Sequence, residues 1–541
     1  MSRPNPVTFA AVLVLMLAAL AGPSIFMGGL YVGKHEGDML HLLQIVFRME
    51  DGQWPHLDFM TPIGALAFAP IVAFLEAGFP IGKSIIYAQA LVAIVLLPAI
   101  WWVGRSRLSP ALAYLFGGLV LVLVLALVHG EAQRSVSISM HYNRWAWALS
   151  YIGIALALLP ERGERREGVD GVILGLVAAA LAMIKVTYLV AFLPGILVAL
   201  LARKRLKTIL TALLVGLGVA GAITVWAGPA FWLAYLQDLL AVAGSDVRSY
   251  PGEPVDAVIG APLYLGGTLL LIASVILFRQ AGQAVAGLAL LILAPGFIYV
   301  VFQNFGNDPQ WLPLLGVLVL ALLPAAGTVN ASGWDMRLAL TIAGAMAFAI
   351  ASPSVFNMAY SPFRHVATKT EDFALILPRS ERHDDLYSAN IRINRIDARI
   401  GLDGPGTGLE RFAEFAERDE AGEMFGEPLE HCEVVLGLPG WFDEIGADLD
   451  RSGLVAGKRL IAADIFSSHW LFSELEPLVG GAPWFYGGLP GWESADYLLV
   501  PFCPVAIDVR AMVLESAVET GATFTEVRRT PLYALFEIGR P

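Results

Sequence analysis

Charged residues are scarce in this chain. Asp, Glu, Lys and Arg make up 15% of its 541 residues, whereas 57% of the residues are hydrophobic. Soluble globular domains carry about 25% charged and about 45–50% apolar residues, so a wholly soluble protein is excluded. Almost all of the apolar excess lies before about residue 360. After Arg364 the composition becomes charged and mixed, and we expect a domain boundary near residues 355–368.

Cysteines and basic clusters are also rare. The two cysteines, Cys432 and Cys503, both lie in the tail that follows this boundary (residues 365–541). On the extracytoplasmic side of a membrane they could form a disulfide, and two buried free thiols are the alternative. The net charge of −12 is concentrated in the tail. No cluster of Lys and Arg is large enough to indicate nucleic-acid binding, so no nucleic acid is expected as a partner.

Long apolar stretches are abundant. Each is close to 20 residues long, which is enough to cross about 30 Å of hydrocarbon. The first stretch is longer than the apolar region of a cleaved signal, usually about 7–15 residues, so we expect it to remain as a span. We predict eleven spans, near residues 8–30, 83–103, 109–128, 145–160, 169–184, 187–202, 208–227, 259–278, 282–302, 311–326 and 337–355.

The fold class predicted from these patterns is a polytopic α-helical membrane domain with a C-terminal domain outside the membrane. The membrane domain covers residues 1–360. The tail, residues 365–541, alternates short apolar runs with helical stretches, which is typical of a small α/β domain. The lipid bilayer is therefore an expected partner of the first domain.

The distribution of Lys and Arg predicts the orientation, because short basic loops stay in the cytoplasm. With the N-terminus inside, the inner loops carry Arg105, Arg107, Arg162, Arg165, Arg166, Arg203, Lys204, Arg205, Lys207, Arg279 and Arg337. The outer loop 228–258 has one Arg and several acidic residues, and the tail is placed outside. Residues 62–80 contain two prolines and Glu76, and a span there would move Arg105 and Arg107 outside. We predict an interfacial or re-entrant helix instead.

Acidic and histidine side chains are concentrated in the first outer loop, residues 31–62. They are His35, Glu36, Asp38, His41, Glu50, Asp51, His56 and Asp58. The pattern from Asp38 to Arg48 predicts a helix that lies along the membrane, with Asp38 near its N-terminus, where the helix dipole stabilises a carboxylate. A charged carboxylate in this place suits a general base that acts on a hydroxyl. The alternative is that Asp38 caps this helix and Asp58 caps a turn.

Three further polar clusters fall on the same predicted side. Residues 129–147 carry Arg134, His141, Tyr142, Asn143 and Arg144. Arginine forks match phosphate oxygens, although Arg144 beside two tryptophans could simply reach the membrane interface. Lys185 is a lone cation at a tight turn between two spans, where an anionic lipid phosphate, Asp38 or Glu36 would serve as its partner.

The last cluster is the segment FQNFGNDPQW, residues 302–311. Its polar side chains are Gln303, Asn304, Asn307, Asp308 and Gln310. Amides and carboxylates beside aromatic rings are suited to binding sugar hydroxyls, and a simple polar turn is the alternative. Because all four clusters share one predicted side, they indicate a single extracytoplasmic site at the lipid boundary.

The first loop reads E-G-D-x-L…D-G-x-W-P-x-x-D-F-x-x-P-x-G and resembles the first periplasmic loop of GT-C fold glycosyltransferases. The similarity is greatest to bacterial members related to protein mannosyltransferases and aminoarabinose transferases. The matching residues are Glu36, Asp38, Gly52, Pro55, Asp58, Phe59 and Pro62. This chain has His56 in place of the usual tyrosine, and Gly37 separates the usual adjacent acidic pair, so the choice of the base stays open.

This resemblance implies transfer of a sugar from a polyprenyl-phosphate donor to a glycan, lipid or protein acceptor. It places the chain in a bacterial inner membrane, with the N-terminus cytoplasmic and the tail periplasmic. Asp38 would be the general base, with Glu36 as the alternative. No cofactor is expected, although paired carboxylates could hold Mg²⁺ or Mn²⁺. The candidate substrate-binding residues are Asp58, His56, Arg144, His141, Lys185, Gln303, Asn304 and Asn307.

Two other classes of function are compatible with a protein of this composition. A transporter would carry ionisable residues at the middle of several spans, and the predicted spans contain almost none. A non-catalytic envelope assembly protein with an interaction domain is the other alternative, but it does not explain the carboxylates of the first loop.

Overall fold

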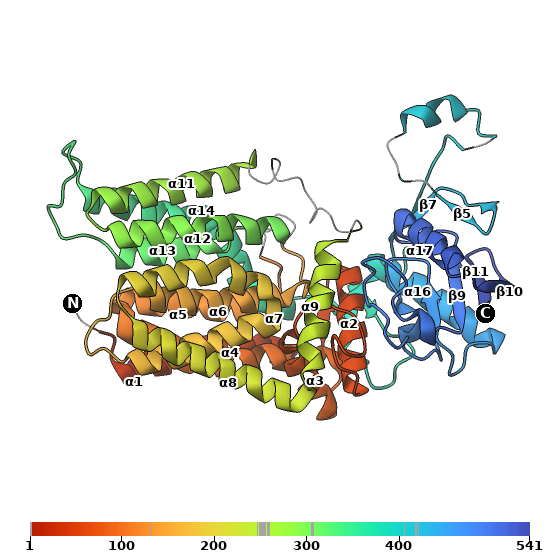
Figure 1. The fold of residues 1–541 in the computed structure, drawn as a ribbon, viewed down its shortest axis with the longest axis horizontal. Coiled ribbons are helices and arrows are strands. Elements are labelled where there is room, and N and C mark those ends of the chain that lie inside the picture. Colours follow the sequence, from red (N-terminus) through yellow and green to blue (C-terminus); the bar gives the residue numbers. More distant parts are fainter. Residues whose placement is uncertain are drawn as a thin grey trace.

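Long helices lie side by side and form most of the molecule (Figure 1). The computed structural model describes residues 3–130, 133–245, 247, 256, 260–304, 308–404, 406–416, 419 and 421–540. Seven of the described helices are long and apolar enough to cross a membrane, so the chain is a helical membrane protein. They are α1 (Pro6–Met27), α4 (Ile81–Arg107), α7 (Glu167–Ala202), α8 (Leu206–Ala227), α11 (Pro262–Gln280), α12 (Ala284–Gln303) and α14 (Met336–Val366).

Shorter helices complete this bundle. They are α2 (Glu36–Glu50), α3 (Ala69–Glu76), α5 (Pro110–Leu125), α6 (His141–Leu158), α9 (Ala230–Ala243) and α13 (Trp311–Ala321). Helices α2 and α9 run across the direction of the long helices, at the end of the bundle that faces the tail (Figure 1). The sequence pattern predicts only a loop where α9 lies. The eight residues of α3 rise only about 12 Å, which is too little to cross a bilayer.

Helix α7 is a hairpin of two helices. Its backbone leaves the helical range at Lys185, where φ is −155° and ψ is 99°. Glu167 at its start accepts a hydrogen bond of 3.2 Å from Arg205, which follows its end. A straight helix of its 36 residues would be about 54 Å long, so the two arms must run antiparallel. The tight turn expected between the segments 169–184 and 187–202 is therefore present.

The predicted span 109–128 is helical only as far as Leu125. Beyond this point the chain is not helical, with Ala126 in an extended conformation, and its carbonyl groups are held by Arg144. The guanidinium donates to the carbonyl of Ala126 at 2.6 Å and to that of Val128 at 2.8 Å. Backbone carbonyls at membrane depth need such a donor, because lipid offers none. Helices α5 and α13 are shorter than the usual length of about 20 residues, and the count of eleven spans stays a prediction.

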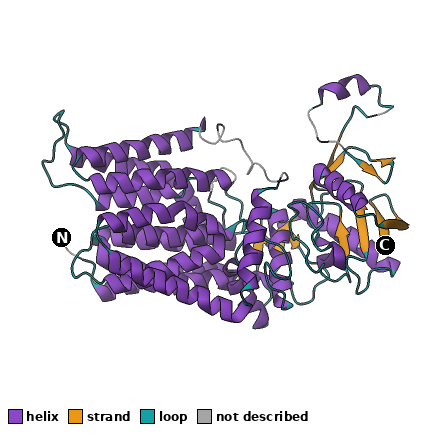
Figure 2. Cartoon of the chain, viewed as in Figure 1, coloured by secondary structure: helices purple, strands orange, loops and turns teal. Residues whose placement is uncertain are grey.

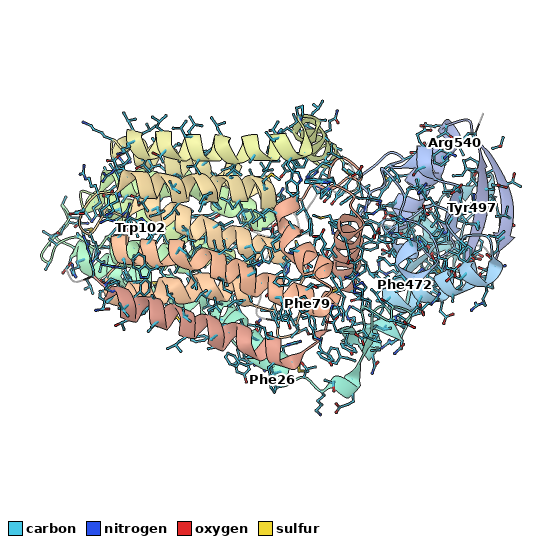
Figure 3. The ribbon with its side chains drawn as sticks, turned by 90° about the horizontal axis from the view of Figure 1, so that it is seen from below. Phe26, Phe79, Trp102, Phe472, Tyr497 and Arg540 are labelled. Atoms are coloured by element: carbon cyan, nitrogen blue, oxygen red, sulfur yellow. A yellow bond between two sulfur atoms is a disulfide. The ribbon has the colours of Figure 1, made fainter. Side chains whose placement is uncertain are left out.

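Basic residues of three predicted inner loops meet at the end of the bundle farthest from the tail. Arg107 forms an ion pair of 2.5 Å with Asp170, whose other oxygen accepts a hydrogen bond of 2.7 Å from Trp102. Arg205 pairs with Glu161 and Glu167. Figure 3 shows Trp102 at this end, opposite the tail residues Phe472 and Tyr497. The bundle therefore has one end rich in arginine and one end that faces the tail.

The tail contains short strands and helices (Figure 2). Its largest sheet has the strand order β10-β11-β9-β8, in which only β8 and β9 are parallel. The elements are β2 (Phe373–Leu375), β3 (Leu386–Ala389), α15 (Asn390–Ile393), β4 (Asp397–Ile400), β5 (Glu423–Met424), β6 (Glu427–Pro428), β7 (Cys432–Leu436), α16 (Leu438–Ser452), β8 (Leu460–Ala462), β9 (Tyr497–Pro501), α17 (Ile507–Glu519), β10 (Thr523–Arg529) and β11 (Tyr533–Gly539). The expected mixture of helices and strands is confirmed.

The tail is joined to the bundle by shared secondary structure. Strand β1 (Leu30–Val32), directly after α1, pairs in parallel with β3 of the tail, so that Leu30 lies opposite Leu386. The carboxylate of Asp385 accepts hydrogen bonds of 2.7 Å from the backbone N–H groups of Gly82 and Lys83, which begin α4. The first loop and the tail thus form one structural unit, although residues 1–360 and 365–541 are separate in composition.

Helix α2 is enclosed between the bundle and the tail. The side-chain amide of Gln44 donates to the hydroxyl of Ser468 at 2.9 Å and to the carbonyl of Pro483 at 3.0 Å. Arg48 is fully buried and donates to the carbonyl of Leu478 at 2.8 Å. These buried polar contacts fix the position of the helix that carries Glu36 and Asp38.

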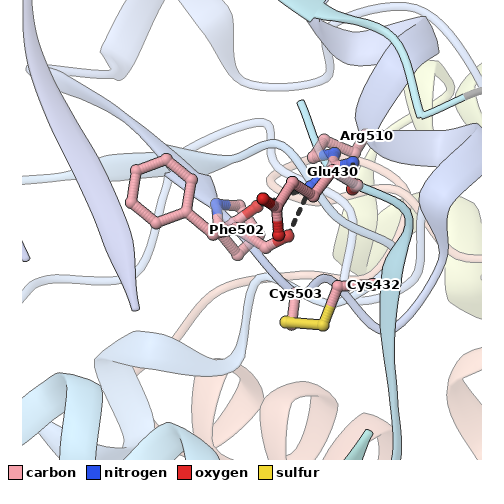
Figure 4. Close-up of a disulfide and its surroundings, with 6 residues drawn as sticks. Glu430, Cys432, Phe502, Cys503 and Arg510 are labelled. Atoms are coloured by element: carbon pink, nitrogen blue, oxygen red, sulfur yellow. Dashed lines mark hydrogen bonds between the residues drawn. A yellow bond between two sulfur atoms is a disulfide. The ribbon is translucent and has the colours of Figure 1, made fainter. Parts of the chain in front are cut away.

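Cys432 and Cys503 form a disulfide, with their Cα atoms 4.7 Å apart (Figure 4). It joins β7 to the loop that follows β9. Beside it, the buried guanidinium of Arg510 donates to the carbonyl groups of Phe502 and Glu430, at 2.7 and 3.2 Å. Of the two alternatives left by the sequence, the structure contains the disulfide.

Removing the disulfide should loosen this part of the tail. The cysteines are 71 residues apart, and closing a loop of this length is worth about 4 kcal/mol in the chain-entropy model. We expect the double substitution Cys432→Ser and Cys503→Ser to speed amide hydrogen exchange in β7 and β9, while α4 and α12 keep their rates. Mass spectrometry of the exchanged protein in nanodiscs measures both. Equal rates in β7 and β9 with and without the disulfide would contradict this expectation.

Candidate functional site

The two carboxylates of the first loop lie in the first turn of α2 but have different partners. Glu36 is buried and forms an ion pair of 3.3 Å with Arg392 of the tail. Asp38 accepts a hydrogen bond from the hydroxyl of Ser139, which belongs to the segment before α6. Glu36 is therefore paired with the tail, whereas Asp38 contacts the segment before α6.

The residues just before α2 form a polar and largely buried turn. His35 has a left-handed backbone with φ 63°, and its Nδ1 lies 2.9 Å from the hydroxyl of Ser137. Burial lowers the pKa of His35 to about 3, assisted by the charges of Lys34 and Arg392 and by His129, so His35 is neutral at pH 7. Burial, together with Arg392, lowers the pKa of Lys34 to about 8.

Lys185 is held at the turn of α7 by two side-chain amides. Its ammonium donates to Asn304 Oδ1 at 2.7 Å and to Asn143 Oδ1 at 3.0 Å, and lies 5.5 Å from the centre of the Tyr142 ring. Asn304 also donates to the hydroxyl of Tyr188 at 3.0 Å. The predicted second, third and fourth polar clusters therefore meet at this ammonium.

A largely apolar groove leads to Lys185. Its volume is about 840 Å³, and it lies between the second arm of α7, α9 and α12. Residues with polar side chains lie at one part of its wall, among them Tyr142, Lys185 and Gln303. Apolar residues form most of the rest: Ile63, Val186, Val190, Ala191, Pro194, Leu239, Val242, Ala243, Ile292, Pro295 and Phe302. Ligand sites typically measure about 300–1,000 Å³, so this groove is large enough for a long apolar ligand.

A second, much smaller cavity of about 10 Å³ lies among polar side chains next to Lys185. His129, Asn143, Arg144, Asn304, Asp308 and Gln310 line it. Burial raises the pKa of Asp308, and a hydrogen bond from Ser354 opposes this shift. The cavity is about the size of one water molecule. Asp308 and Gln310 therefore belong to the support of the site and not to the large groove.

Arg144 and His141 support backbone at the start of α6. Arg144 is 2% exposed, and both of its terminal nitrogens donate to the carbonyl groups of the non-helical segment after α5. His141 is equally buried, and its Nε2 lies 2.9 Å from the carbonyl of Ala67. A role in binding phosphate stays a prediction for Arg144, as does substrate binding for His141.

His56 and Asp58 fix the second part of the first loop. His56 Nδ1 lies 2.8 Å from Asp238 Oδ2 on α9, and the same oxygen accepts the backbone N–H of Thr61 at 3.1 Å. Asp58 accepts the backbone N–H of Trp54 at 2.6 Å and so caps a turn. Both residues thus hold the loop against its neighbours, and their proposed contact with substrate stays untested.

Of the predicted amide residues, Asn304 holds Lys185 and Gln303 lines the large groove. Asn307 lies outside the described residues. Among the residues that the structure describes, no three His, Cys, Asp or Glu side chains are grouped as a metal site would require.

Three residues of this arrangement are absent from the candidates predicted by sequence: Ser139, Asp238 and Arg392. Ser139 lies in the run Ser-Val-Ser-Ile-Ser, whose period of two indicates an extended segment with one hydroxyl-bearing face. That period is a signal that could have identified it. Asp238 and Arg392 have no comparable signal, because their contacts join segments that are far apart in the sequence.

Comparison with family models, with curated proteins and with solved structures finds no match to this chain.

The contact between His56 and Asp238 should matter for stability. Asp238→Ala leaves His56 Nδ1 and the N–H of Thr61 without their acceptor, and each buried unsatisfied group costs about 1–3 kcal/mol. We expect a lower midpoint of thermal unfolding in detergent, measured by tryptophan fluorescence. Gln237→Ala changes the exposed neighbour on the same helix and serves as the matched control. Equal midpoints for the two variants would contradict the assigned role.

Proposed function

We propose that the chain is an extracytoplasmic membrane glycosyltransferase of the GT-C type that takes a sugar from a polyprenyl-phosphate donor. The observation that carries this proposal is the large apolar groove, which leads to the ammonium of Lys185. Ser139, which holds Asp38, is four residues from Asn143, which holds Lys185. Four residues span at most about 14 Å, so Asp38 and Lys185 contact the same short stretch of chain, residues 139–143.

Asp38 is the better candidate for the base. A general base needs an ionised carboxylate that can reach the acceptor hydroxyl. Glu36 is 5% exposed and forms an ion pair with Arg392 of the tail. This ion pair compensates its negative charge and makes Glu36 a weaker proton acceptor. Asp38 is half-buried, lies in the first turn of α2 and accepts a hydrogen bond from the hydroxyl of Ser139, which favours the negatively charged form of the carboxylate. The positive end of the helix dipole stabilises that charge.

Lys185 is the candidate for binding the donor phosphate. Helix α6 begins immediately beside it, since Asn143 of the first turn of α6 accepts from the ammonium. The ammonium also lies 5.5 Å from the centre of the Tyr142 ring, and both residues line the groove. A cation at one part of a largely apolar wall suits a ligand with an anionic head group. The apolar part of the groove would accept the polyprenyl chain.

The proposed reaction is a substitution at the anomeric carbon of the sugar. Asp38 removes the proton of the acceptor hydroxyl, and the acceptor oxygen forms a bond to the anomeric carbon. The bond from that carbon to the phosphate oxygen breaks, and polyprenyl phosphate leaves with the electron pair. Lys185 stabilises the charge that develops on the phosphate. A glycan, lipid or protein would supply the hydroxyl.

The same proposal places the chain in a bacterial inner membrane with the tail in the periplasm. Disulfides persist in oxidising compartments, so the bond between Cys432 and Cys503 supports an extracytoplasmic tail. The arginine-rich end of the bundle would then face the cytoplasm, in agreement with the rule for basic loops. Eleven spans, with the hairpin α7 counted as two, complete this topology.

Replacing the base should remove activity without removing binding. Purified protein in nanodiscs is offered labelled polyprenyl-phosphate sugars and envelope acceptors, and transfer is followed by chromatography. A general base typically contributes about 10²–10⁴-fold to the rate, so Asp38→Asn should lose at least about 10²-fold in kcat while still binding the donor. Asp51→Asn, at the exposed end of α2 in the same loop, is the matched control and should keep the wild-type rate. If Asp38→Asn keeps the wild-type rate, the base is a different residue. If wild type binds and consumes none of the lipid-linked sugars, the proposed function fails.

Replacing the cation should weaken binding of the donor lipid. Hydrogen bonds to charged groups are worth about 1.5–3 kcal/mol, so Lys185→Gln should reduce the affinity for polyprenyl phosphate by about tenfold or more. Native mass spectrometry of the protein with the lipid measures this affinity. Lys83→Gln, which removes a cation at the start of α4 outside the groove, should bind as wild type does. Equal affinities for the two variants would refute the phosphate role of Lys185.

A further inference from the structure

Ser139 is held by three separate hydrogen bonds that leave its hydroxyl directed at Asp38. Its backbone N–H donates to the hydroxyl of Ser137 at 3.2 Å. Its carbonyl accepts from His129 Nδ1 at 3.0 Å, and its hydroxyl donates to Asp38 Oδ2. Ser139 is only 4% exposed. The hydrogen bonds of its N–H and carbonyl groups fix the backbone of Ser139, and this fixes the position from which its hydroxyl reaches Asp38.

The backbone on both sides of this contact is unusual. His35, directly before α2, has φ 63°, and Met140, directly after Ser139, has φ 47°. Residues other than glycine rarely adopt left-handed conformations, which store of order 1–3 kcal/mol and persist only where the surroundings impose them. The two strained residues turn the chain sharply into α2 and into α6. The hydrogen bond between Asp38 and Ser139 thus joins the first turn of α2 to the residue that precedes the N-cap of α6.

From this geometry we propose that Ser139 is the positioning residue for Asp38, holding the carboxylate ionised and oriented toward the acceptor hydroxyl. The inference rests on the proposed function and adds a residue that no motif of the first loop contains. Ser139 itself exchanges no proton with substrate. Its O–H remains a donor to Oδ2 while the carboxylate is charged, and a hydrogen bond to the charged form favours that form.

The other charged and titratable groups around this turn include Lys34, His35 and Glu36 on the first loop, His41 one turn further along α2, His129 on the segment before α6, and Arg392 of the tail. Glu36 and Arg392 neutralise each other at 3.3 Å. His35 is neutral at pH 7, because burial lowers its pKa to about 3. Lys34 and His129 are the same in all variants described below, so a difference between these variants reports the hydroxyl at position 139.

The test measures the protonation of Asp38 without requiring enzymatic activity. Dicyclohexylcarbodiimide modifies protonated carboxyl groups in apolar surroundings, and mass spectrometry of the peptide that contains residues 36–50 measures the modification. In wild type, labelling of Asp38 should fall as pH rises. In Ser139→Ala the same curve should move up by about one pH unit, because a hydrogen bond to a charged group is lost. Ser139→Thr, which restores a hydroxyl, should return the curve toward that of wild type.

Two further variants separate positioning from mere folding. Ser135→Ala changes a serine of the same run that lies outside these contacts, and it should label as wild type does. Asp38→Asn should not be labelled at this position, which confirms the assignment of the peptide. If Ser139→Ala and wild type share one curve, the inference is overturned. It is also overturned if Ser139→Thr moves the curve as far as Ser139→Ala does, because a role in packing alone would explain that result.

The transfer assay distinguishes this inference from the proposed function. With an active wild type, Ser139→Ala should lower kcat with little change in the KM for the donor, and should move the acidic limb of the rate profile in the same direction as the labelling curve. If wild type transfers no sugar, the proposed function fails, and the labelling curves still decide whether Ser139 holds Asp38 charged. If wild type is active and its profile is unchanged in Ser139→Ala, the positioning role fails alone.

Discussion

A non-helical segment within a bundle of apolar helices has backbone groups that lipid cannot satisfy, and the candidate site depends on how this protein satisfies them. Between α5 and α6 the carbonyl groups of Ala126 and Val128 are held by Arg144. Polar residues of α14 hold the next part, since Ser354 and Asn357 donate to the carbonyl groups of Gly130 and Gln133. With these partners the described parts of the segment can stay non-helical, and Ser139 reaches Asp38. The contact between Ser139 and Asp38 therefore depends on buried polar side chains of α6 and α14 that hold the backbone of this segment.

The site also lies where two parts of different composition meet. Helix α2 has an apolar side against the bundle and buried polar contacts with the tail through Gln44 and Arg48. The tail thus acts as part of the scaffold, because Arg392 reaches the first turn of α2 and Asp385 caps the start of α4. Helix α2, which carries Asp38, is therefore held from two sides, by the bundle and by the tail.

Composition and periodicity predict the coarse architecture well, because burial in lipid constrains whole segments. The apolar helices, the mixed tail, the helix that starts near Asp38 and the turn at Lys185 all follow from local patterns. The early end of α5 at Leu125 does not, since it depends on a guanidinium that arrives from α6. The pairing of Glu36 with Arg392 and of His56 with Asp238 is equally hidden, because such contacts join residues between 182 and 356 positions apart. Local sequence patterns indicate which residue types a site contains. Long-range contacts determine which of these residues lie together, and local patterns do not reveal those contacts.

The parallel pairing of β1 with β3 has a consequence for the order in which this protein is assembled. Leu30 leaves the ribosome early, whereas its partner Leu386 is synthesised about 360 residues later. At about 5–20 residues per second, the interval is about 20–70 seconds. During that time the first loop has neither its strand partner nor the arginine that neutralises Glu36. The candidate site is therefore completed only after the last helix has been inserted and the tail has been delivered to the same side of the membrane, so a truncated chain would carry the acidic loop in an incomplete form.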